Sequence, residues 1–449
     1  MFDVALVNPD ESLFASIAWT LWTEGFLGTE LLAGAIPGIE NRVYWTPPLY
    51  YVALSGWLGT WGLSLLSVRS LSIAFYILTL ALQAMAARRV GFRHVWVPSV
   101  VLLADPVLAK VGVLGRMDMM AIALSVATLT VASAYPKGSK GPALGGVLGA
   151  ACVLTHPLGL AAAIAAALES ALAGRRQLLA FIGGFLPGIL VWGLYILQAP
   201  GDFSEQMSLQ LQRKADYPWT LLESLGRQLV HYGSYRYLAP TLWIAGVVGL
   251  SLYWRRVRPW AVAAALSWPA VWFSGELGYT AYLVPYTAMG VHGLLSTIRR
   301  GHWVAAVSLA AYLIALVVSW PPLGRIDPEY ESYCDRYSAG LPPRSKVILA
   351  VLPDPWFGLR KRRDLHLQHA SPVPLSRRRL IDYYTSADFV IAGGYNVPGL
   401  FPSGDEAGTV EKGLVLEWND IASEGQTLWI LWEGTLLEIV EVDTTHFDD

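Results

Sequence analysis

The chain has 449 residues, of which 54% are hydrophobic and only 15% are charged, and its formal net charge is −2. Soluble domains carry nearer a quarter charged residues, whereas apolar stretches long enough to cross a bilayer recur here through the first 320 positions. This composition predicts a polytopic membrane protein. The near-neutral charge, without a basic face or stripe, argues against a nucleic-acid partner.

Residues 1–62 contain no clean membrane span, because prolines interrupt them and five tryptophans are spread along them. Aromatic-rich amphipathic helices of this kind lie in the plane of the membrane interface. Near the start, Asp10 and Glu11 place two adjacent carboxylates at the mouth of the predicted bundle, where acids are costly unless hydrated or partnered. The pair is therefore a functional-site hypothesis. A helix N-terminus is the alternative interpretation, since Asn8-Pro9 followed by two acids is also typical of a cap.

Ten apolar segments between residues 63 and 320 predict a transmembrane bundle. We place them at 64–87, 95–113, 117–134, 143–155, 158–173, 178–197, 238–254, 259–273, 279–298 and 303–320. The fourth and fifth segments are short and are separated only by Thr155-His156-Pro157. The proline favours a break there, and the alternative is a single kinked helix, which would invert everything downstream.

The distribution of Lys and Arg in the short loops decides between these two topologies. With ten spans, one side carries twelve basic residues and the opposite short loops carry only Lys110 and Arg116. The basic side is therefore predicted to be cytoplasmic, and the protein is predicted to be a multi-pass protein of the plasma membrane. This topology puts on the outer face Asp10, Glu11, Asp118, His156, Glu276 and the chain after residue 320.

Residues 324–449 change character, because charged residues return and short apolar runs alternate with polar stretches. Four runs have the length and composition of buried strands, namely 347–352, 389–392, 428–432 and 436–440. We expect a small α/β domain outside the cytoplasm. It contains no Gly-rich phosphate loop, metal-spaced His/Cys cluster or nucleophile elbow. The basic runs 360–363 and 377–379 are interpreted as a solvated face, with lipid-headgroup contact as the alternative.

Four motifs accompany the acidic pair along the chain. They are Pro47-Pro48-Leu49-Tyr50-Tyr51, Val68-Arg69-Ser70-Leu71-Ser72, Gly115-Arg116-Met117-Asp118 and Thr155-His156-Pro157-Leu158-Gly159-Leu160. Together with an acidic pair ahead of interfacial helices, they resemble the GT-C fold glycosyltransferases. The most similar branch holds the protein O-mannosyltransferases and the bacterial aminoarabinose and lipid-A sugar transferases. The similarity covers residues 8–160 well and residues 160–320 by hydropathy only.

The resemblance implies a polyprenyl- or dolichyl-phosphate-linked sugar donor and transfer to a lipid, glycan or protein acceptor on the outer face. It also implies an aspartate base from the first outer loop, so Asp10 is the expected base. Direct attack by the acceptor hydroxyl would invert the anomeric carbon. Glu11 is expected to orient the acceptor, hold a metal or modulate the charge of Asp10. The family has a span ahead of the acidic pair, whereas this chain starts seven residues before Asn8. We therefore expect either an apolar segment encoded upstream of Met1 or a bundle without its first helix.

Transfer from a lipid phosphate also needs groups that hold the departing phosphate, and the remaining charged residues are candidates for this role. Asp118 is expected to be a second acid of the site, and Arg116 or Lys110 to grip the donor phosphate. The alternative for Arg116 and Asp118 is an ion pair that snorkels at the interface. Arg69 lies one or two turns into its span and needs a partner, so a structural ion pair stands beside a phosphate contact. His156 is assigned to the phosphate, with a helix cap as the alternative.

Three tyrosines, Tyr50, Tyr279 and Tyr282, are expected to line the substrate pocket. For Tyr279 and Tyr282, an ordinary interfacial aromatic belt is the alternative interpretation. The sequence names no cofactor. The three candidate acids supply hard oxygen ligands but no recognisable metal spacing, so a divalent cation stays an open option.

A transporter or flippase for a lipid-linked substrate is the alternative function from another class. It predicts functional charges near the middle of the bilayer and internal repeats. The visible charges instead cluster at one face, and the sequence shows no convincing repeat. An inactive membrane scaffold is a second alternative, which the missing first helix keeps open.

Overall fold

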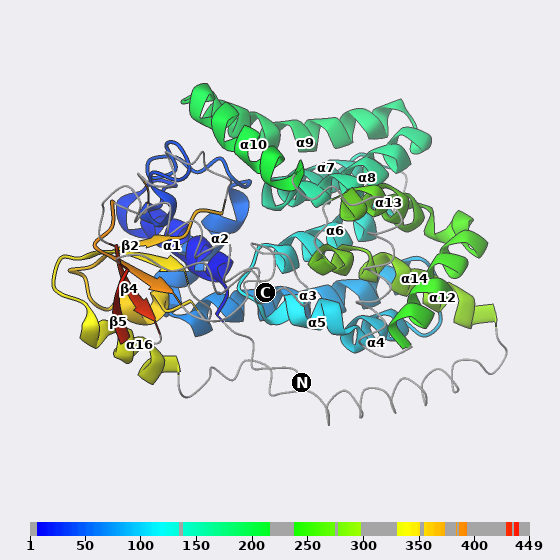
Figure 1. Cartoon of the computed structure of the whole chain (residues 1–449). Coiled ribbons are helices and arrows are strands. Elements are labelled where there is room, and N and C mark those ends of the chain that lie inside the picture. Colours follow the sequence, from blue (N-terminus) through cyan, green and yellow to red (C-terminus); the bar gives the residue numbers. More distant parts are fainter. Residues whose placement is uncertain are drawn as a thin grey trace.

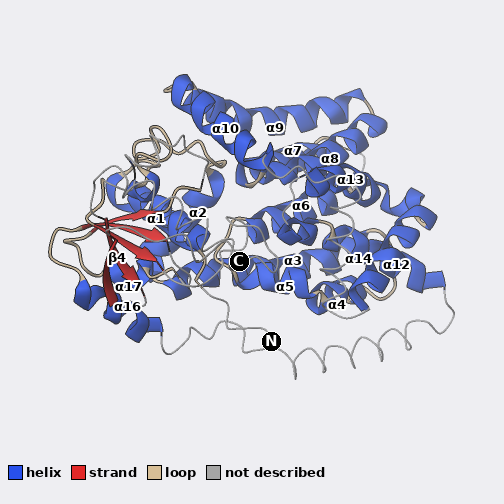
Figure 2. Ribbon diagram, in the orientation of Figure 1, coloured by secondary structure: helices blue, strands red, loops and turns tan. Residues whose placement is uncertain are grey.

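The computed structural model describes residues 7–133, 138–215, 238–273, 277–297, 330–350, 354–372, 383, 386–392, 428–432 and 435–439. Figure 1 shows a large helical bundle beside a smaller part. The smaller part contains α1 (Pro9–Glu24), α2 (Leu49–Trp61) and a β-sheet. Figure 2 places every described strand in this smaller part.

The helices of the bundle follow one another closely along the chain. Their bounds are α3 (Leu65–Arg89), α4 (Val97–Ala104), α5 (Pro106–Val113), α6 (Asp118–Ala132), α7 (Lys140–Thr155), α8 (Leu160–Ala173), α9 (Arg175–Ile196), α12 (Leu238–Leu252), α13 (Trp254–Phe273) and α14 (Val284–Thr297). Within the described residues, α3 and α9 are long and apolar enough to cross a membrane by length and composition. The predicted segment 303–320 and Glu276 lie outside the described residues.

Two breaks in the bundle have local causes. At residues 155–157 the sequence favours two helices, and α7 indeed ends at Thr155 while α8 begins at Leu160 after the 3-10 turn η2 (Pro157–Gly159). The apolar segment 95–113 also breaks, which its hydropathy alone does not predict. There, Asp105 adopts an extended backbone and its carboxylate accepts a hydrogen bond from the Leu108 N–H at 2.9 Å. This cap and Pro106 start a new helix.

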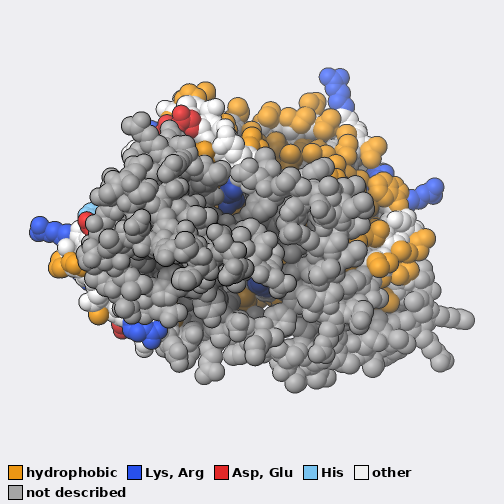
Figure 3. Space-filling view, in the orientation of Figure 1, with side chains coloured by type: hydrophobic (Ala, Val, Ile, Leu, Met, Phe, Trp, Pro, Cys, Tyr) orange, Lys and Arg blue, Asp and Glu red, His pale blue; other side chains and the backbone are white. Residues whose placement is uncertain are grey.

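The outer surface of the bundle is apolar. In α9 only Phe181 is buried, whereas large side chains such as Leu190, Val191 and Leu194 are more than 60% exposed. Figure 3 shows hydrophobic side chains gathered over this part of the molecule. Proteins rarely expose contiguous apolar patches of this kind unless a membrane or a partner covers them. The surface of α9 therefore agrees with a lipid-facing helix.

Glycines let the bundle helices approach closely. A Cβ added at Gly146 in α7 would lie 2.0 Å from the Phe181 carbonyl oxygen, and one at Gly184 in α9 would lie 2.1 Å from the Ala143 oxygen. In α12 and α14, a Cβ at Gly290 would lie 1.9 Å from the Gly246 oxygen. These separations are shorter than any real contact, so both helix pairs depend on residues without a side chain.

Among the described residues, four helical elements lie outside the bundle in addition to α1 and α2. Their bounds are η1 (Glu30–Leu32), α10 (Pro200–Ala215), α16 (Tyr330–Gly340) and α17 (Trp356–Leu359), while a further 3-10 helix, η3 (Leu277–Tyr282), precedes α14.

The tail contains a five-stranded sheet in the order β2-β1-β3-β4-β5. The strands are β1 (Lys346–Ala350), β2 (His366–His369), β3 (Phe389–Ala392), β4 (Leu428–Trp432) and β5 (Thr435–Ile439). The first four pair in parallel, and β4 and β5 form an antiparallel pair. All four predicted runs are strands. Sequence reasoning missed β2, because its four residues include two histidines and a glutamine rather than a hydrophobic run.

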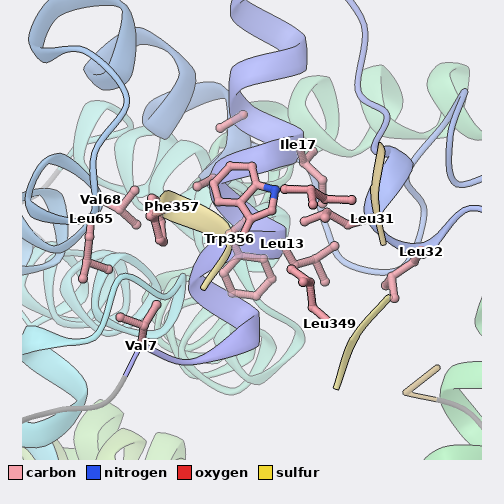
Figure 4. Close-up of a cluster of buried hydrophobic side chains, with 14 of the residues drawn as sticks. Val7, Leu13, Ile17, Leu31, Leu32, Leu65, Val68, Leu349, Trp356 and Phe357 are labelled. Atoms are coloured by element: carbon pink, nitrogen blue, oxygen red, sulfur yellow. The ribbon is translucent and has the colours of Figure 1, made fainter. Parts of the chain in front are cut away.

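The tail and the start of the chain share one hydrophobic core. Figure 4 shows Val7, Leu13 and Ile17 packed with Leu349, Trp356 and Phe357. The Gln368 side chain in β2 also donates to the Ala33 carbonyl oxygen at 3.1 Å. The units predicted at 1–62 and 324–449, although far apart in sequence, are therefore packed together.

The basic run 360–363 is only partly a solvated face. The Arg360 guanidinium lies over the rings of Trp356 and Trp19, at 4.8 and 5.7 Å from their centroids. Arg362 donates to the carbonyl oxygens of Ser338 and Leu341, and so closes the end of α16. Two of the four cations thus hold the tail together. The run 377–379 lies outside the described residues.

Neighbouring glycines of α9 give a matched test of the helix packing. Gly184→Ala should lower the free energy of unfolding by about 1–3 kcal/mol, because the added methyl overpacks the contact with α7. Gly183→Ala should be neutral or stabilising by up to about 1 kcal/mol, because nothing lies within 4 Å of that position. Unfolding in mixed detergent micelles measures both variants, and equal effects would contradict the packing.

Candidate active site

A capping box at the start of α1 holds the acidic pair. The Asn8 side chain accepts a hydrogen bond from the Asp10 N–H at 2.9 Å, and the Glu11 carboxylate accepts one from the Asn8 N–H at 3.0 Å. Pro9 occupies the first helical turn, where its missing N–H costs nothing. The interpretation of this sequence as a helix N-terminus is thus confirmed. Because adjacent helical residues point about 100° apart, the two carboxylates face different surroundings.

Glu11 points into the protein and is fully buried. Its carboxylate receives the Nε and Nη2 groups of Arg69 at 2.8 and 2.9 Å, which is a two-point ion pair. The Gly115 N–H adds a further hydrogen bond at 2.8 Å. The Arg69 side chain is only 3% exposed. Arg69 therefore has the structural partner that its depth in α3 requires, and this carboxylate joins α1 to α3 and to the segment before α6.

Asp10 points the other way and is 37% exposed. The Arg116 Nη1 group lies 2.6 Å from its carboxylate, and the Arg116 Nε group lies 3.0 Å from the carboxylate of Asp118. One guanidinium thus bridges two acids that stand 108 residues apart in the sequence. Asp118 is 4% exposed, so Asp10 is the more accessible of the two. The structure brings these three predicted site residues together.

Aromatic residues close the cluster on the side of Asp118. The Tyr282 hydroxyl donates to the Asp118 carboxylate at 3.2 Å. The His156 ring lies 5.2 Å from the rings of both Tyr279 and Tyr282, and its Nδ1 accepts the Leu158 N–H at 3.1 Å. His156 therefore caps η2, as its alternative interpretation states, and at the same time borders the cluster. Tyr282 is buried and holds Asp118.

Tyr50 lies on the other side, in the first turns of α2. It is buried, and its ring packs at 5.8 Å from that of Phe14 in α1. Burial raises the pKa of the Tyr50 phenol well above its usual value, and the nearby carboxylates of Glu11 and Asp118 raise it further. The phenol is therefore neutral at any physiological pH, which makes it a hydrogen-bonding group and not a base.

Two further components that the sequence suggested for the site, Lys110 and a divalent cation, are not linked to the cluster by the described residues. Lys110 is exposed on α5, and within the described residues no hydrogen bond or ion pair links it to the acids. Within that same part of the chain, no three His, Cys, Asp or Glu residues gather as metal ligands. Asp10 and Asp118 are bridged by a guanidinium, and the oxygens of Glu11 face Arg69. The divalent cation therefore stays an untested prediction.

Sequence reasoning included Gly115 in a motif without giving it a role, and it missed the contacts of Gln206 near the start of the chain. Gly115 supplies its N–H to Glu11, and a Cβ there would lie 2.3 Å from a methyl of Val68, so only glycine fits. Its place directly before Arg116 was the available signal. Gln206 in α10 is fully buried and bonds to the backbone of Tyr44, Pro37 and Arg42. Nothing in the sequence around Gln206 indicates this contact.

The far ends of α3 and α6 also contact each other, and a further ion pair joins α13 to α8. Arg89 at the end of α3 donates to the Thr130 carbonyl oxygen near the end of α6. Arg258 and Glu169 form a two-point ion pair, with both nitrogen–oxygen distances at 2.6 Å. The candidate site and the predicted basic side are thus found at opposite ends of α3 and α6.

No protein-family model matches the sequence, and no curated protein sequence does either. Among solved structures, the chain is similar to ArnT from Cupriavidus metallidurans bound to undecaprenyl phosphate, with a TM-score of 0.56 at 15% identity over 96% of this chain and 89% of that chain. The apo state of ArnT gives a TM-score of 0.54 with the same identity and coverage. An oligosaccharyltransferase from Archaeoglobus fulgidus gives 0.49 at 12% identity over 85% of this chain and 61% of that chain.

The likeness to ArnT establishes the fold. The GT-C fold that the sequence motifs predict is therefore confirmed, and so is a helical bundle with a small α/β unit in the tail.

The two arginine–glutamate pairs predict contrasting losses of stability. Arg69→Met leaves the buried Glu11 carboxylate without its cation and should cost about 3–5 kcal/mol of the free energy of unfolding. Arg258→Met should cost about 1 kcal/mol or less, because the Arg258 side chain is 38% exposed and water screens the pair. The measurement is unfolding in mixed detergent micelles, and an Arg69 loss no larger than the Arg258 loss would contradict the buried pair.

Proposed function

We propose that the chain is an integral membrane glycosyltransferase that moves one sugar from a polyprenyl-phosphate carrier to an acceptor on the outer face of the membrane. The observation that carries the proposal is the bridge from Arg116 to Asp10 and Asp118, which places an exposed carboxylate beside a cation within a GT-C fold. The similar ArnT structure is bound to undecaprenyl phosphate. That ligand supports the same class of carrier here.

Asp10 is the proposed base. The acceptor oxygen attacks the anomeric carbon, its proton passes to the Asp10 carboxylate, and the bond from the anomeric carbon to the phosphate oxygen breaks. The electron pair of that bond leaves with the lipid phosphate. Asp10 suits this role because its carboxylate is the accessible one of the cluster. A positioned base contributes about 10²–10⁴ to the rate of such a step.

Arg116 is the proposed phosphate ligand. In the described arrangement it binds two carboxylates, and an arriving donor phosphate competes with Asp10 for the Nη1 group. When the phosphate takes that position, the Asp10 carboxylate is released towards the acceptor hydroxyl. Asp118 keeps the guanidinium oriented through Nε, and Tyr282 orients Asp118 in turn. A fixed cation at the leaving phosphate stabilises the charge that develops there.

Glu11 and Arg69 have a supporting role in this proposal. Their charges neutralise one another inside the protein, and the hydrogen bonds from Gly115 and Asn8 to Glu11 add to that pairing. A carboxylate engaged in this way does not reach an acceptor. The pair instead sets the distance between α1, which carries Asp10, and the segment that carries Arg116.

The proposed topology puts the cluster and the tail on the same side of the membrane, away from the cytoplasm. It is supported by the position of the acids and of Arg89 at opposite ends of the bundle helices, and by the packing of the tail against α1. Lys110 and His156 remain proposed secondary contacts for the donor phosphate, and Tyr50 and Tyr279 remain proposed borders of the substrate pocket.

Replacement of the base tests the proposal. Asp10→Asn keeps the shape of the side chain but cannot take a proton, so kcat should fall by about 10²–10⁴. The KM for the donor should stay the same or fall, because the phosphate no longer competes with a carboxylate for Arg116. The assay supplies the purified protein in nanodiscs with a polyprenyl-phosphate sugar and measures the released lipid phosphate. Glu24→Gln, at the exposed end of the same helix, is the matched control. An Asp10→Asn variant with the kcat of this control would end the assignment.

Cysteine labelling tests the topology. Lys361 is 70% exposed in the tail, and Arg175 is exposed at the start of α9, while the native Cys152 and Cys334 are buried. In intact cells, a membrane-impermeant thiol reagent should label Lys361→Cys and leave Arg175→Cys unlabelled until the cells are opened. The reverse pattern would put the acids on the wrong side for the proposed donor.

A further inference from the structure

The tail of the chain reaches the start of the helix that carries the acidic pair. Asp354 lies in the segment that follows β1 and is 1% exposed. Its N–H donates to the carbonyl oxygen of Val7 at 3.0 Å. Val7 stands three residues before Asp10, so this hydrogen bond joins the tail to the backbone that leads into the candidate base.

Asp354 is also the point where several elements of the tail meet. Its carbonyl oxygen accepts the hydroxyl of Tyr330 from α16 at 2.6 Å. Its Oδ1 accepts the N–H of Trp356, the first residue of α17, at 3.0 Å. A single residue thus connects two helices of the tail with the chain ahead of α1. Its backbone position is set by its side chain.

His369 faces the second carboxylate oxygen of Asp354. The His369 Nε2 lies 3.0 Å from Asp354 Oδ2, and both side chains are buried. Within the described part of the chain neither of these two atoms has a hydrogen-bond partner, so the ring and the carboxylate meet as a close polar contact. The Tyr383 hydroxyl donates to the carbonyl oxygen of His369 at 2.6 Å, which holds the end of β2. The polar contact of His369 places the end of β2 directly against Asp354.

Asn8 connects Val7 to the acidic pair through short hydrogen bonds. After Val7 comes Asn8, whose N–H donates to Glu11 and whose side chain accepts from the N–H of Asp10. No flexible residue intervenes, because Pro9 restricts the backbone between them. A displacement at Val7 is therefore passed to the Asp10 carboxylate. Displacements of about 1 Å in catalytic groups can cost on the order of 10² in rate.

We infer that Asp354 and His369 are positioning residues for the reaction, through which the tail sets the place of Asp10 against Arg116. This inference rests on the proposed function and extends it to the α/β unit, which then belongs to the active enzyme. If the tail were instead an appended binding module, the loss of one buried carboxylate in it would leave the kcat of transfer unchanged.

The test uses the full chain in nanodiscs with two variants. Asp354→Ala removes both side-chain contacts, and His369→Gln removes the ring that faces Oδ2. Both should lower kcat by about 10- to 100-fold and leave the donor KM within about twofold, because Arg116 is untouched. Asp364→Asn is the control. It breaks a partly exposed ion pair with Arg362 in the same domain, and its kcat should match that of the unmodified protein.

Hydrogen exchange supplies a readout that does not need activity. In Asp354→Ala, amide exchange in the peptide 7–14 should accelerate about tenfold or more, since the cap of α1 opens more often, while Asp364→Asn leaves it unchanged. Unchanged exchange would overturn the inference, and so would faster exchange with the kcat of the control. If the unmodified protein transfers no sugar from any donor, the proposed function fails, and the exchange result alone decides whether Asp354 holds α1.

Discussion

The site depends on one buried ion pair. Glu11 and Arg69 neutralise each other out of contact with water, and the N–H groups of Gly115 and Asn8 complete the hydrogen bonding of the carboxylate. Removing one partner of such a pair costs far more than the pair itself contributes, because a buried charge is left alone. The pair therefore acts chiefly as a geometric constraint. It fixes α1, α3 and the start of α6 relative to one another, and with them Asp10 and Arg116.

Two adjacent acids of the same charge thus have different surroundings and different uses. Helix geometry turns Glu11 inward to Arg69 and turns Asp10 outward to the Arg116 guanidinium and the solvent. The electrostatic surroundings differ accordingly, since Arg69 neutralises the buried Glu11 carboxylate and the Asp10 carboxylate stays accessible to solvent. The tail adds a second constraint just ahead of α1, through the hydrogen bond from the Asp354 N–H to the Val7 carbonyl oxygen.

Much of this arrangement was predictable from the sequence, because it is local or was indicated by the family resemblance. The cap at Asn8, the break at His156 and the four hydrophobic strands follow from residue patterns. The motif around Arg116 indicated that Arg116 and Asp118 belong to the same site as Asp10, although more than a hundred residues separate them in the sequence. Other features depend on tertiary packing that no local pattern encodes. Which acid turns inward, the polar strand β2, and the stacking of Arg360 on Trp356 and Trp19 are of this kind.

The most direct measurement of the central claim is incubation of the purified protein with a panel of undecaprenyl-phosphate sugars. We expect release of free lipid phosphate from at least one member of the panel, in a one-to-one ratio with a glycosylated acceptor, and inversion at the anomeric carbon of the transferred sugar. Release of no lipid phosphate from any donor, in the presence of lipid, glycan and protein acceptors, would contradict it.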